Sequence, residues 1–196
     1  MIEIHPLRIA GRWREGFALD VHTTRSVYLG EDEFGQPQYD TERSPAGELL
    51  FQLKYRSDQS AVAPLVEVAG GFVRGRWPAA DVVVPVPPSR PRPSQPVLLL
   101  GEAIAQGLGV SFLPAAVRRQ REVPELKDVR DFDERLRLLD GAHAVDAPAV
   151  QGRRVLLFDD LFRSGATMNA IAAALYDEGR AEDVVALTIT RTRSNR

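Results

Sequence analysis

The sequence predicts an α/β fold in which helices flank a twisted parallel sheet, with a small β-rich appendage at the N-terminus. The first sign is two continuous apolar runs, at 81–86 and 153–158, because strands buried on both faces show such runs. The second is their alternation with helical stretches at 97–108 and 168–178, which favours a sheet covered on both faces. The third is the alternating pattern of the first fifty residues, which is typical of antiparallel strands.

Composition indicates an ordinary globular protein. The 196 residues suffice for a sizeable core, and 44% hydrophobic with 27% charged residues is typical of such domains. The net charge of −2 gives no general attraction to nucleic acid or to an anionic membrane. Without cysteine the chain has neither a disulfide framework nor a zinc site built on thiolates. No signal peptide or membrane span is visible, and we expect a cytoplasmic protein without membrane partners.

The N-terminal segment is predicted to contain a small antiparallel sheet, followed by two helices. Gly11, Gly16 and Gly30 separate its short apolar stretches, as turns do between strands. Ser44 and Pro45 then begin a helix, and a second helix covers 59–72. We therefore divide the chain into a β-rich hood or appendage at 1–45, a helical connection at 46–79 and a core at 80–196.

Strands and helices alternate along the core. In order, we expect a strand at 81–86, a helix at 97–108, a short strand at 111–113, a central strand at 153–158, a helix at 168–178 and a final strand at 184–190. Ligands of such sheets bind outside the carboxyl ends of the strands. The segments that follow residues 86 and 158 are therefore expected to meet at one edge.

The most informative segment follows the central strand. Asp159 and Asp160 end that strand, a short loop with one glycine follows, and then a helix begins. The free N–H groups and positive dipole of a helix N-terminus bind phosphate, and a glycine lets the backbone approach the anion. The carboxylates, which we predict to be catalytic, lie one sugar's length away, where they can accept hydrogen bonds from a ribose diol. The predicted phosphate-binding residues are Arg163, Ser164, Gly165, Ala166 and Thr167.

The segment Val155-Leu-Leu-Phe-Asp-Asp-Leu-Phe-Arg-Ser-Gly-Ala-Thr167 resembles the diphosphoribose-binding signature of the type I phosphoribosyltransferases. That resemblance implies their fold, a 5-phosphoribosyl diphosphate (PRPP) ligand, and Mg²⁺ as cofactor. Mg²⁺ would be held mostly by the diphosphate, ribose hydroxyls and water, with Asp159 and Asp160 as further candidates. Phe162 and Arg163 depart from the commonest form of the signature, which has a small aliphatic residue and a Thr or Ser there.

A proline-rich loop leaves the first core strand at the same edge. In a phosphoribosyltransferase this loop would grip the pyrophosphate, since charge-assisted donors stabilise that leaving group. The alternative is a surface loop with solvated arginines. The predicted pyrophosphate-binding residues are Pro87, Pro88, Ser89, Arg90 and Arg92.

Four segments of this chain follow the order seen in ComF/GntX-type proteins, so the sequence resembles that branch of the family in particular. The four segments are Leu53-Lys-Tyr55, Val84-Pro-Val-Pro87 with its arginine loop, Glu134-Arg-Leu-Arg137 and the acidic pair. Such proteins have the phosphoribosyltransferase fold and are associated with DNA uptake in bacteria. This chain lacks their four-cysteine zinc module and the glycine and aromatic residue of their pyrophosphate loop.

The charged segment at 118–140 has two interpretations. The resemblance assigns Arg135 to a flap that closes over the substrate and excludes water. The alternative is a solvated surface helix with i,i+4 ion pairs such as Asp131 with Arg135.

The resemblance implies transfer of a phosphoribosyl group from PRPP to an acceptor, with release of pyrophosphate. No residue stands out as a general base, so the acceptor stays open. The alternatives are a non-enzymatic sensor of PRPP or a nucleotide, and a competence-associated role in which arginines at 118–121 and 191–196 contact nucleic acid. A homodimer is also left open.

Other notable side chains are expected to have structural or surface roles. His5, His22 and His143 show no metal-ligand spacing. Lys54 and Tyr55, at a helix end, could reach a base or a phosphate, but we expect them to form a surface pair. Trp13 and Trp77 are expected to fill the junction between the N-terminal sheet and the core.

Overall fold

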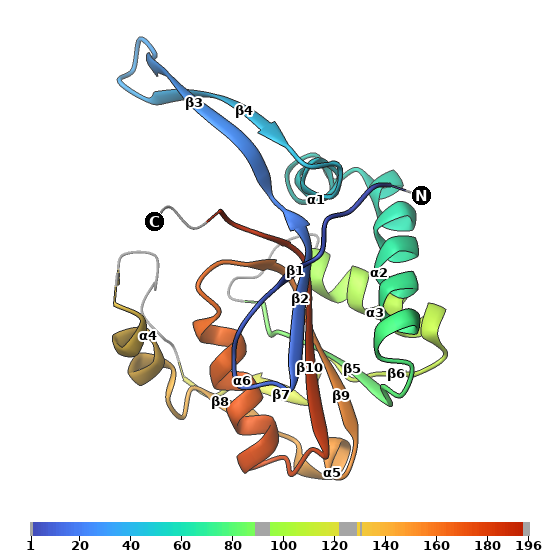
Figure 1. The fold of residues 1–196 in the computed structure, drawn as a ribbon. Helices are drawn as coiled ribbons and strands as arrows, with labels where there is room; N and C mark the ends of the chain where they lie inside the picture. The colour runs from blue at the N-terminus through green and yellow to red at the C-terminus, as the bar shows by residue number, and fades with distance from the viewer. Residues whose placement is uncertain (1, 89–94, 122–128, 130, 194–196) are drawn as a thin grey trace.

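A mostly parallel sheet forms the centre of the molecule, as the sequence predicts. The computed structural model describes residues 2–88, 95–121, 129 and 131–193 (Figure 1). The described strands of this sheet run in the order β1 (Leu7–Arg8), β2 (Glu15–Val21), β10 (Asp183–Arg191), β9 (Arg154–Phe162), β5 (Val82–Pro85) and β6 (Ser111–Phe112). Every neighbouring pair is parallel except β1 with β2. The carboxyl ends of β2, β10, β9 and β5 therefore share one edge.

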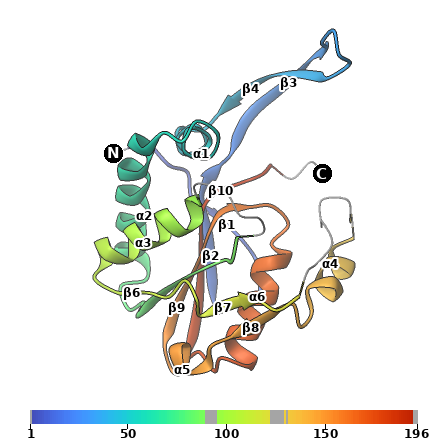
Figure 2. The same ribbon diagram turned by 180° about the vertical axis from the view of Figure 1, so that it is seen from behind.

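Helices cover both faces of the sheet (Figures 1 and 2). One face carries α1 (Pro45–Tyr55), α2 (Val62–Arg76) and α3 (Pro96–Leu108), with the short 3-10 helix η1 (Gln59–Ala61) before α2. Their apolar side chains pack with those of Leu156, Phe158 and Leu187. The opposite face carries α6 (Ala166–Asp177), whose Ile171 and Leu175 pack with Leu157. Among the described helices, none is long and apolar enough to cross a membrane.

The capping residues explain where α1 begins. The Ser44 side chain accepts a hydrogen bond from the backbone N–H of Gly47, and Pro45 occupies the first turn, where a missing N–H costs nothing. The Ser44 hydroxyl also donates to the carbonyl oxygen of Val21, at 2.5 Å, and so fixes α1 to the end of β2. Leu50 and Leu53, on the face of α1 that packs on the core, are fully buried.

The prediction that the N-terminal strands form one small antiparallel sheet is wrong. β2 pairs in parallel with β10, from Glu15 opposite Val185 to Val21 opposite Arg191, and so belongs to the central sheet. Its inner residues are buried without alternation, as in any strand covered on both faces. Only β3 (Thr23–Glu31) and β4 (Pro37–Arg43) form a separate hairpin, which projects from the body (Figure 2). The division at 45 and 79 remains a prediction.

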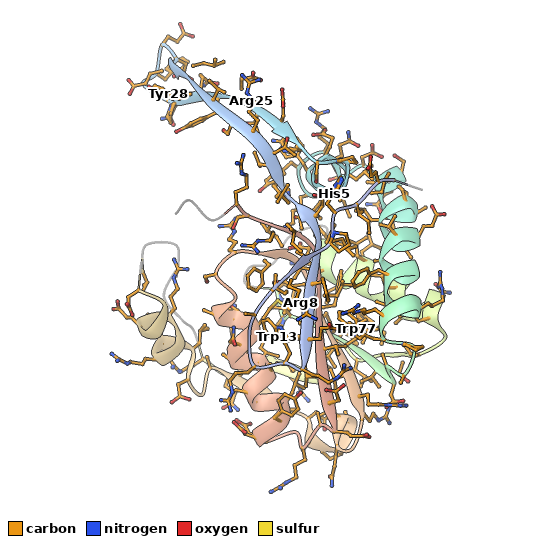
Figure 3. All side chains as sticks on the ribbon, in the orientation of Figure 1. His5, Arg8, Trp13, Arg25, Tyr28 and Trp77 are labelled. Atoms are coloured by element: carbon orange, nitrogen blue, oxygen red, sulfur yellow. The ribbon has the colours of Figure 1, made fainter. Side chains whose placement is uncertain are left out.

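The two tryptophans are buried in the core on opposite sides of β2, rather than at a junction with a separate N-terminal sheet, because β2 belongs to the central sheet. Trp13 packs edge-on against Phe162, with ring centroids 6.4 Å apart, and Trp77 packs against Phe17 and Phe72. Both indole N–H groups are satisfied, by the Ile9 carbonyl oxygen and the Glu15 carboxylate respectively. Figure 3 shows both within the body, far from Tyr28 on the hairpin.

Some short elements between β6 and β9 are absent from the prediction: β7 (Val117–Arg119), β8 (His143–Val145) and α5 (Ala147–Val150). The helix α4 (Phe132–Leu139) lies in the charged segment, for which a surface helix was one of the two interpretations. β7 and β8 pair as a two-stranded antiparallel sheet beside α6, and α4 packs on α6. Asp131 caps α4 by accepting a hydrogen bond from the Glu134 N–H, so a helix does form in the charged segment.

Candidate functional site

The acidic pair lies within β9, which continues to Phe162 rather than ending at Phe158 as expected. The strand continues because β10 keeps pairing with it, with Asp159 opposite Thr188 and Phe162 opposite Arg191. Successive side chains of a strand point to opposite faces. Asp160 faces α1, while an oxygen of Asp159 accepts the N–H of Asp160 at 2.8 Å. The pair therefore presents one carboxylate to each side of the sheet edge.

Lys54 forms an ion pair with the acidic motif that the sequence did not predict. Its Nζ lies 2.8 Å from Oδ1 of Asp160, and the two side chains are only 12% and 14% exposed. The expectation that Lys54 and Tyr55 form a surface pair is therefore wrong for the lysine, although Tyr55 is 64% exposed. The last turn of α1 lies at the carboxyl edge of the sheet, so this lysine reaches a carboxylate 106 positions later in the chain.

The electrostatics of the pair favour a protonated Asp159. Burial raises the pKa of this carboxyl far above its usual range, and the neighbouring charge of Asp160 raises it further. The Asp160 N–H and the cations of Lys54 and Arg163 oppose that shift without cancelling it. A protonated carboxyl beside a carboxylate can both donate to and accept from a diol.

The loop after β9 has the glycine-dependent geometry predicted for a phosphate site. Gly165 has φ +77°, and a Cβ at this position would lie 2.6 Å from the Phe162 ring. Only glycine satisfies both constraints. Asn169 supports the turn, because its Nδ2 donates to the Gly165 carbonyl oxygen at 2.9 Å while its Oδ1 accepts the Arg12 N–H at 2.8 Å. Nothing in the sequence singles out Asn169, which stands in the first turns of a helix with no distinguishing pattern.

The predicted phosphate-binding residues surround the N-terminus of α6. Arg163 is exposed, Ser164 and Thr167 are half-buried, and Gly165 and Ala166 are buried. The first N–H groups of a helix have no partner within the helix. These groups lie at the same edge as the acidic pair, from which two residues of β9 and a three-residue turn separate them. The Ala166 N–H donates to the Ser164 hydroxyl oxygen at 3.5 Å. The structure thus brings the acids and the loop together in one segment.

The predicted pyrophosphate loop leaves the sheet beside this segment. The Val86 N–H donates to the Phe158 carbonyl oxygen at 2.8 Å, which puts Pro87 and Pro88 next to the start of the acidic pair. Both prolines are half-buried. Ser89, Arg90 and Arg92 lie outside the described residues.

Arg135 lies on α4, which packs against α6. Its Nε donates to the Val129 carbonyl oxygen at 2.6 Å, and its side chain is part-buried. Its assignment to a substrate-covering flap remains a prediction.

A cavity of about 510 Å³ lies at the same edge, between the base of the β3–β4 hairpin and the end of β10. It is lined by His22, Thr23, Ser26, Tyr39, Thr192 and Arg193. The sequence does not show that these residues meet, because they come from distant segments that only the parallel pairing of β2 with β10 brings together.

Comparison with solved structures identifies the fold as that of the type I phosphoribosyltransferases. An adenine phosphoribosyltransferase is 14% identical, with a TM-score of 0.51 over 85% of this chain and 84% of that one. The adenine phosphoribosyltransferase of Saccharomyces cerevisiae, in complex with an imino-altritol bisphosphate and adenine, has the same identity and TM-score, over 85% and 83% of the two chains. No protein-family model and no curated protein matches the sequence. At this identity the likeness shows the fold alone.

Proposed function

We propose that this protein binds PRPP or a nucleoside 5′-phosphate at the carboxyl edge of its sheet, and that it transfers the phosphoribosyl group of PRPP to an acceptor, releasing pyrophosphate. The observation that carries the proposal is the single segment in which Asp159 and Asp160 precede a glycine turn and the N-terminus of α6. A ribose 5-phosphate has a diol at one end and a dianion at the other, and this segment offers complementary groups to both. The phosphoribosyltransferase fold supports the assignment.

The 5′-phosphate would bind the start of α6. Its oxygens would accept hydrogen bonds from the first N–H groups of the helix and from the hydroxyls of Ser164 and Thr167, while Arg163 adds a positive charge. The glycine at position 165 keeps the turn in the conformation that places the start of α6 at this edge, because a side chain there would be strained at φ +77° and would meet Phe162.

The acidic pair would hold the ribose hydroxyls. Bond breaking at the anomeric carbon develops positive charge on the sugar, as in glycoside cleavage, and a neighbouring carboxylate stabilises that charge. Lys54 compensates the charge of Asp160 in the free protein, so binding exchanges a lysine contact for hydroxyl contacts. Arg90 and Arg92 are proposed to receive the pyrophosphate.

The described residues fit a magnesium ion that enters with its ligand. Among them, no three His, Asp or Glu side chains converge to hold a metal, and Lys54 already occupies one face of the acidic pair. Mg²⁺ prefers water and phosphate oxygens and needs few protein ligands. When bound, it would neutralise charge on the diphosphate and so favour its departure.

The test is calorimetric binding of PRPP, with and without Mg²⁺, to the wild type and to the Asp159→Asn/Asp160→Asn double variant. Asp177→Asn is the matched control, because this carboxylate lies at the far end of α6 with its side chain 64% exposed. We expect binding by the wild type and the control and at least a 100-fold loss in the double variant, with the fold intact by circular dichroism. Full retention in the double variant, or no binding by folded wild type, would contradict the proposal.

Pyrophosphate release separates an enzyme from a sensor. Release in the presence of an acceptor supports the transferase, whereas tight binding without release by any acceptor would indicate a PRPP or nucleotide sensor. The ComF-like branch and a DNA role rest on sequence resemblance; salt-sensitive binding of DNA, not PRPP, would favour them.

A further inference from the structure

Asn169 connects the turn before α6 to a segment near the N-terminus of the chain. Its side chain is only 8% exposed, and both of its polar atoms are used. Nδ2 donates to the Gly165 carbonyl oxygen at 2.9 Å, and Oδ1 accepts from the Arg12 backbone N–H at 2.8 Å. The Asn169 N–H also donates to the Gly165 carbonyl oxygen, at 2.8 Å. One buried amide therefore joins the turn to a residue 157 positions away in the chain.

The segment that carries Arg12 is the connection between β1 and β2, and Trp13 holds it in place. The indole Nε1 donates to the Ile9 carbonyl oxygen at 3.0 Å, and the ring is buried. The ring packs so closely on this connection that a Cβ on Gly11 or Gly16 would collide with it. The Arg12 N–H is therefore presented to Asn169 from a fixed backbone.

A second contact links the same connection to the turn. Trp13 packs edge-on against Phe162, with ring centroids 6.4 Å apart and ring planes at 81°. Phe162 in turn lies against Gly165, where a Cβ would be 2.6 Å from its ring. Both rings are buried in the cluster on the α6 face of the sheet (Figure 3 labels Trp13). The aromatic contact and the Asn169 amide thus meet the turn at the same glycine.

Fixing the Gly165 carbonyl also fixes the first N–H of α6. The carbonyl of Gly165 and the N–H of Ala166 belong to one planar peptide group, so they point in opposite directions. Because two hydrogen bonds from Asn169 hold this carbonyl along the helix, the Ala166 N–H is directed out of the helix N-terminus. Its contact with the Ser164 hydroxyl oxygen, at 3.5 Å, is long and weak. A turn oriented in this way can bind an anion without the cost of ordering the loop.

We propose that Asn169 is a positioning residue for the 5′-phosphate, and that Trp13 and Phe162 help it to hold the turn in its binding geometry. The inference rests on the function proposed above and adds that the connection between β1 and β2 takes part in phosphate binding. Asn169 does not itself bind the phosphate, because its side chain is buried and both polar atoms have partners. Its replacement should therefore weaken phosphate binding without disturbing the acidic pair.

An NMR titration tests this inference through the amide signals of Ala166 and Thr167. The two ligands are inorganic phosphate, which needs only the turn and the helix N-terminus, and ribose 5-phosphate, which also uses the acidic pair. We expect both to shift these signals in the wild type. Asn169→Ala removes two hydrogen bonds, each worth a factor of about 2–10, and the released turn must be ordered on binding. Both ligands should therefore bind at least about 10-fold more weakly.

Tyr176→Phe is the matched control on the same helix. It removes the hydrogen bond in which the Tyr176 hydroxyl oxygen accepts from the Val184 N–H at 2.8 Å, far from the turn. It should lower stability and leave both affinities unchanged, which separates positioning of the turn from general loosening of α6. Phe162→Leu removes the ring contact with Trp13 and should weaken both ligands by about 2–10-fold. This second variant keeps the inference testable if Asn169→Ala does not fold.

The outcomes separate this inference from the proposed function. If Asn169→Ala or Phe162→Leu folds and binds both ligands as tightly as the wild type, the positioning role is overturned. An equal loss of affinity in Tyr176→Phe overturns it as well. If neither ligand shifts the signals of the wild type, the phosphate site fails, and the inference and the proposed function fail together. If the wild type binds inorganic phosphate but not ribose 5-phosphate, the proposed function fails, while the variants' affinity for inorganic phosphate still decides the inference.

Discussion

Replacement of Lys54 by methionine probes the ion pair between Lys54 and Asp160 at the carboxyl edge of the sheet. The substitution keeps the apolar stem of the side chain and removes only the charge. It leaves Asp160, 14% exposed, beside Asp159 without its cation. We therefore expect a loss of stability that depends on pH.

The magnitude follows from the geometry. At the 2.8 Å separation of Nζ and Oδ1, an effective dielectric of about 20 gives roughly 6 kcal/mol of attraction, much of it offset by desolvation. Removing one partner of a fully buried pair costs about 3–5 kcal/mol. Because some exposure remains on both side chains, we expect about 2–3 kcal/mol at pH 8, or roughly 5–10 °C in Tm.

The dependence on pH has a definite sign. Folding raises the pKa of Asp159, so the folded state holds this proton more tightly than the unfolded state does. Its contribution to stability is present below the unfolded pKa and is lost as pH rises toward the folded pKa. Removal of Lys54 raises the folded pKa further, so the deficit of the variant should grow between pH 5 and pH 8.

Urea unfolding followed by fluorescence of the buried Trp13 and Trp77 measures these differences. Lys54→Arg should recover most of the loss because it keeps the charge. In a double-mutant cycle with Asp160→Asn, the loss of stability in the double variant should be smaller than the sum of the two single losses by more than about 1 kcal/mol. If Lys54→Met loses less than about 0.5 kcal/mol of unfolding free energy at pH 8, or if the losses of the two single variants simply add, the ion pair does not stabilise the fold as expected.

Two further predictions concern the turn at Gly165 and the stability of the fold at acidic pH. In Gly165→Ala the new residue must adopt φ +77° and place its methyl group 2.6 Å from the Phe162 ring, so the free energy of unfolding should fall by about 2–4 kcal/mol. The control is Gly71→Ala, in an open helical position, which should raise the free energy of unfolding slightly. Equal effects in thermal melts would contradict this. Burial lowers the pKa of His143 to about 4, so its contribution to stability is complete above pH 6.5 and is lost as pH falls toward 4. Urea unfolding should show a loss of about 3 kcal/mol across that window, and His143→Leu should lack it.

The sequence predicts the inner strands and the glycine turn before α6 because local patterns specify both. Continuous apolar runs identify β5, β9 and β10, and the Ser44-Pro45 pair identifies the start of α1. The acids and Gly165 stand within seven residues of one another, so their proximity in the fold is fixed by the chain itself.

Features that depend on distant pairing could not be predicted in this way. β2 enters the central sheet because β10 offers it a parallel edge, and nothing within residues 15–21 encodes that partner. Lys54 looks like a surface lysine until α1 is placed against the sheet, and His22 looks isolated until Thr190 lies beside it. The elements at 117–150 are short, and short elements carry weak periodicity.

A crystal structure with ribose 5-phosphate would locate the ligand on the molecule. We expect the phosphate within hydrogen-bond distance of the first N–H groups of α6 and the ribose hydroxyls on Asp159 and Asp160. Phosphate bound instead in the cavity of about 150 Å³ at the opposite sheet edge, where Arg14, Arg76 and Arg154 contribute to the lining, would contradict that expectation.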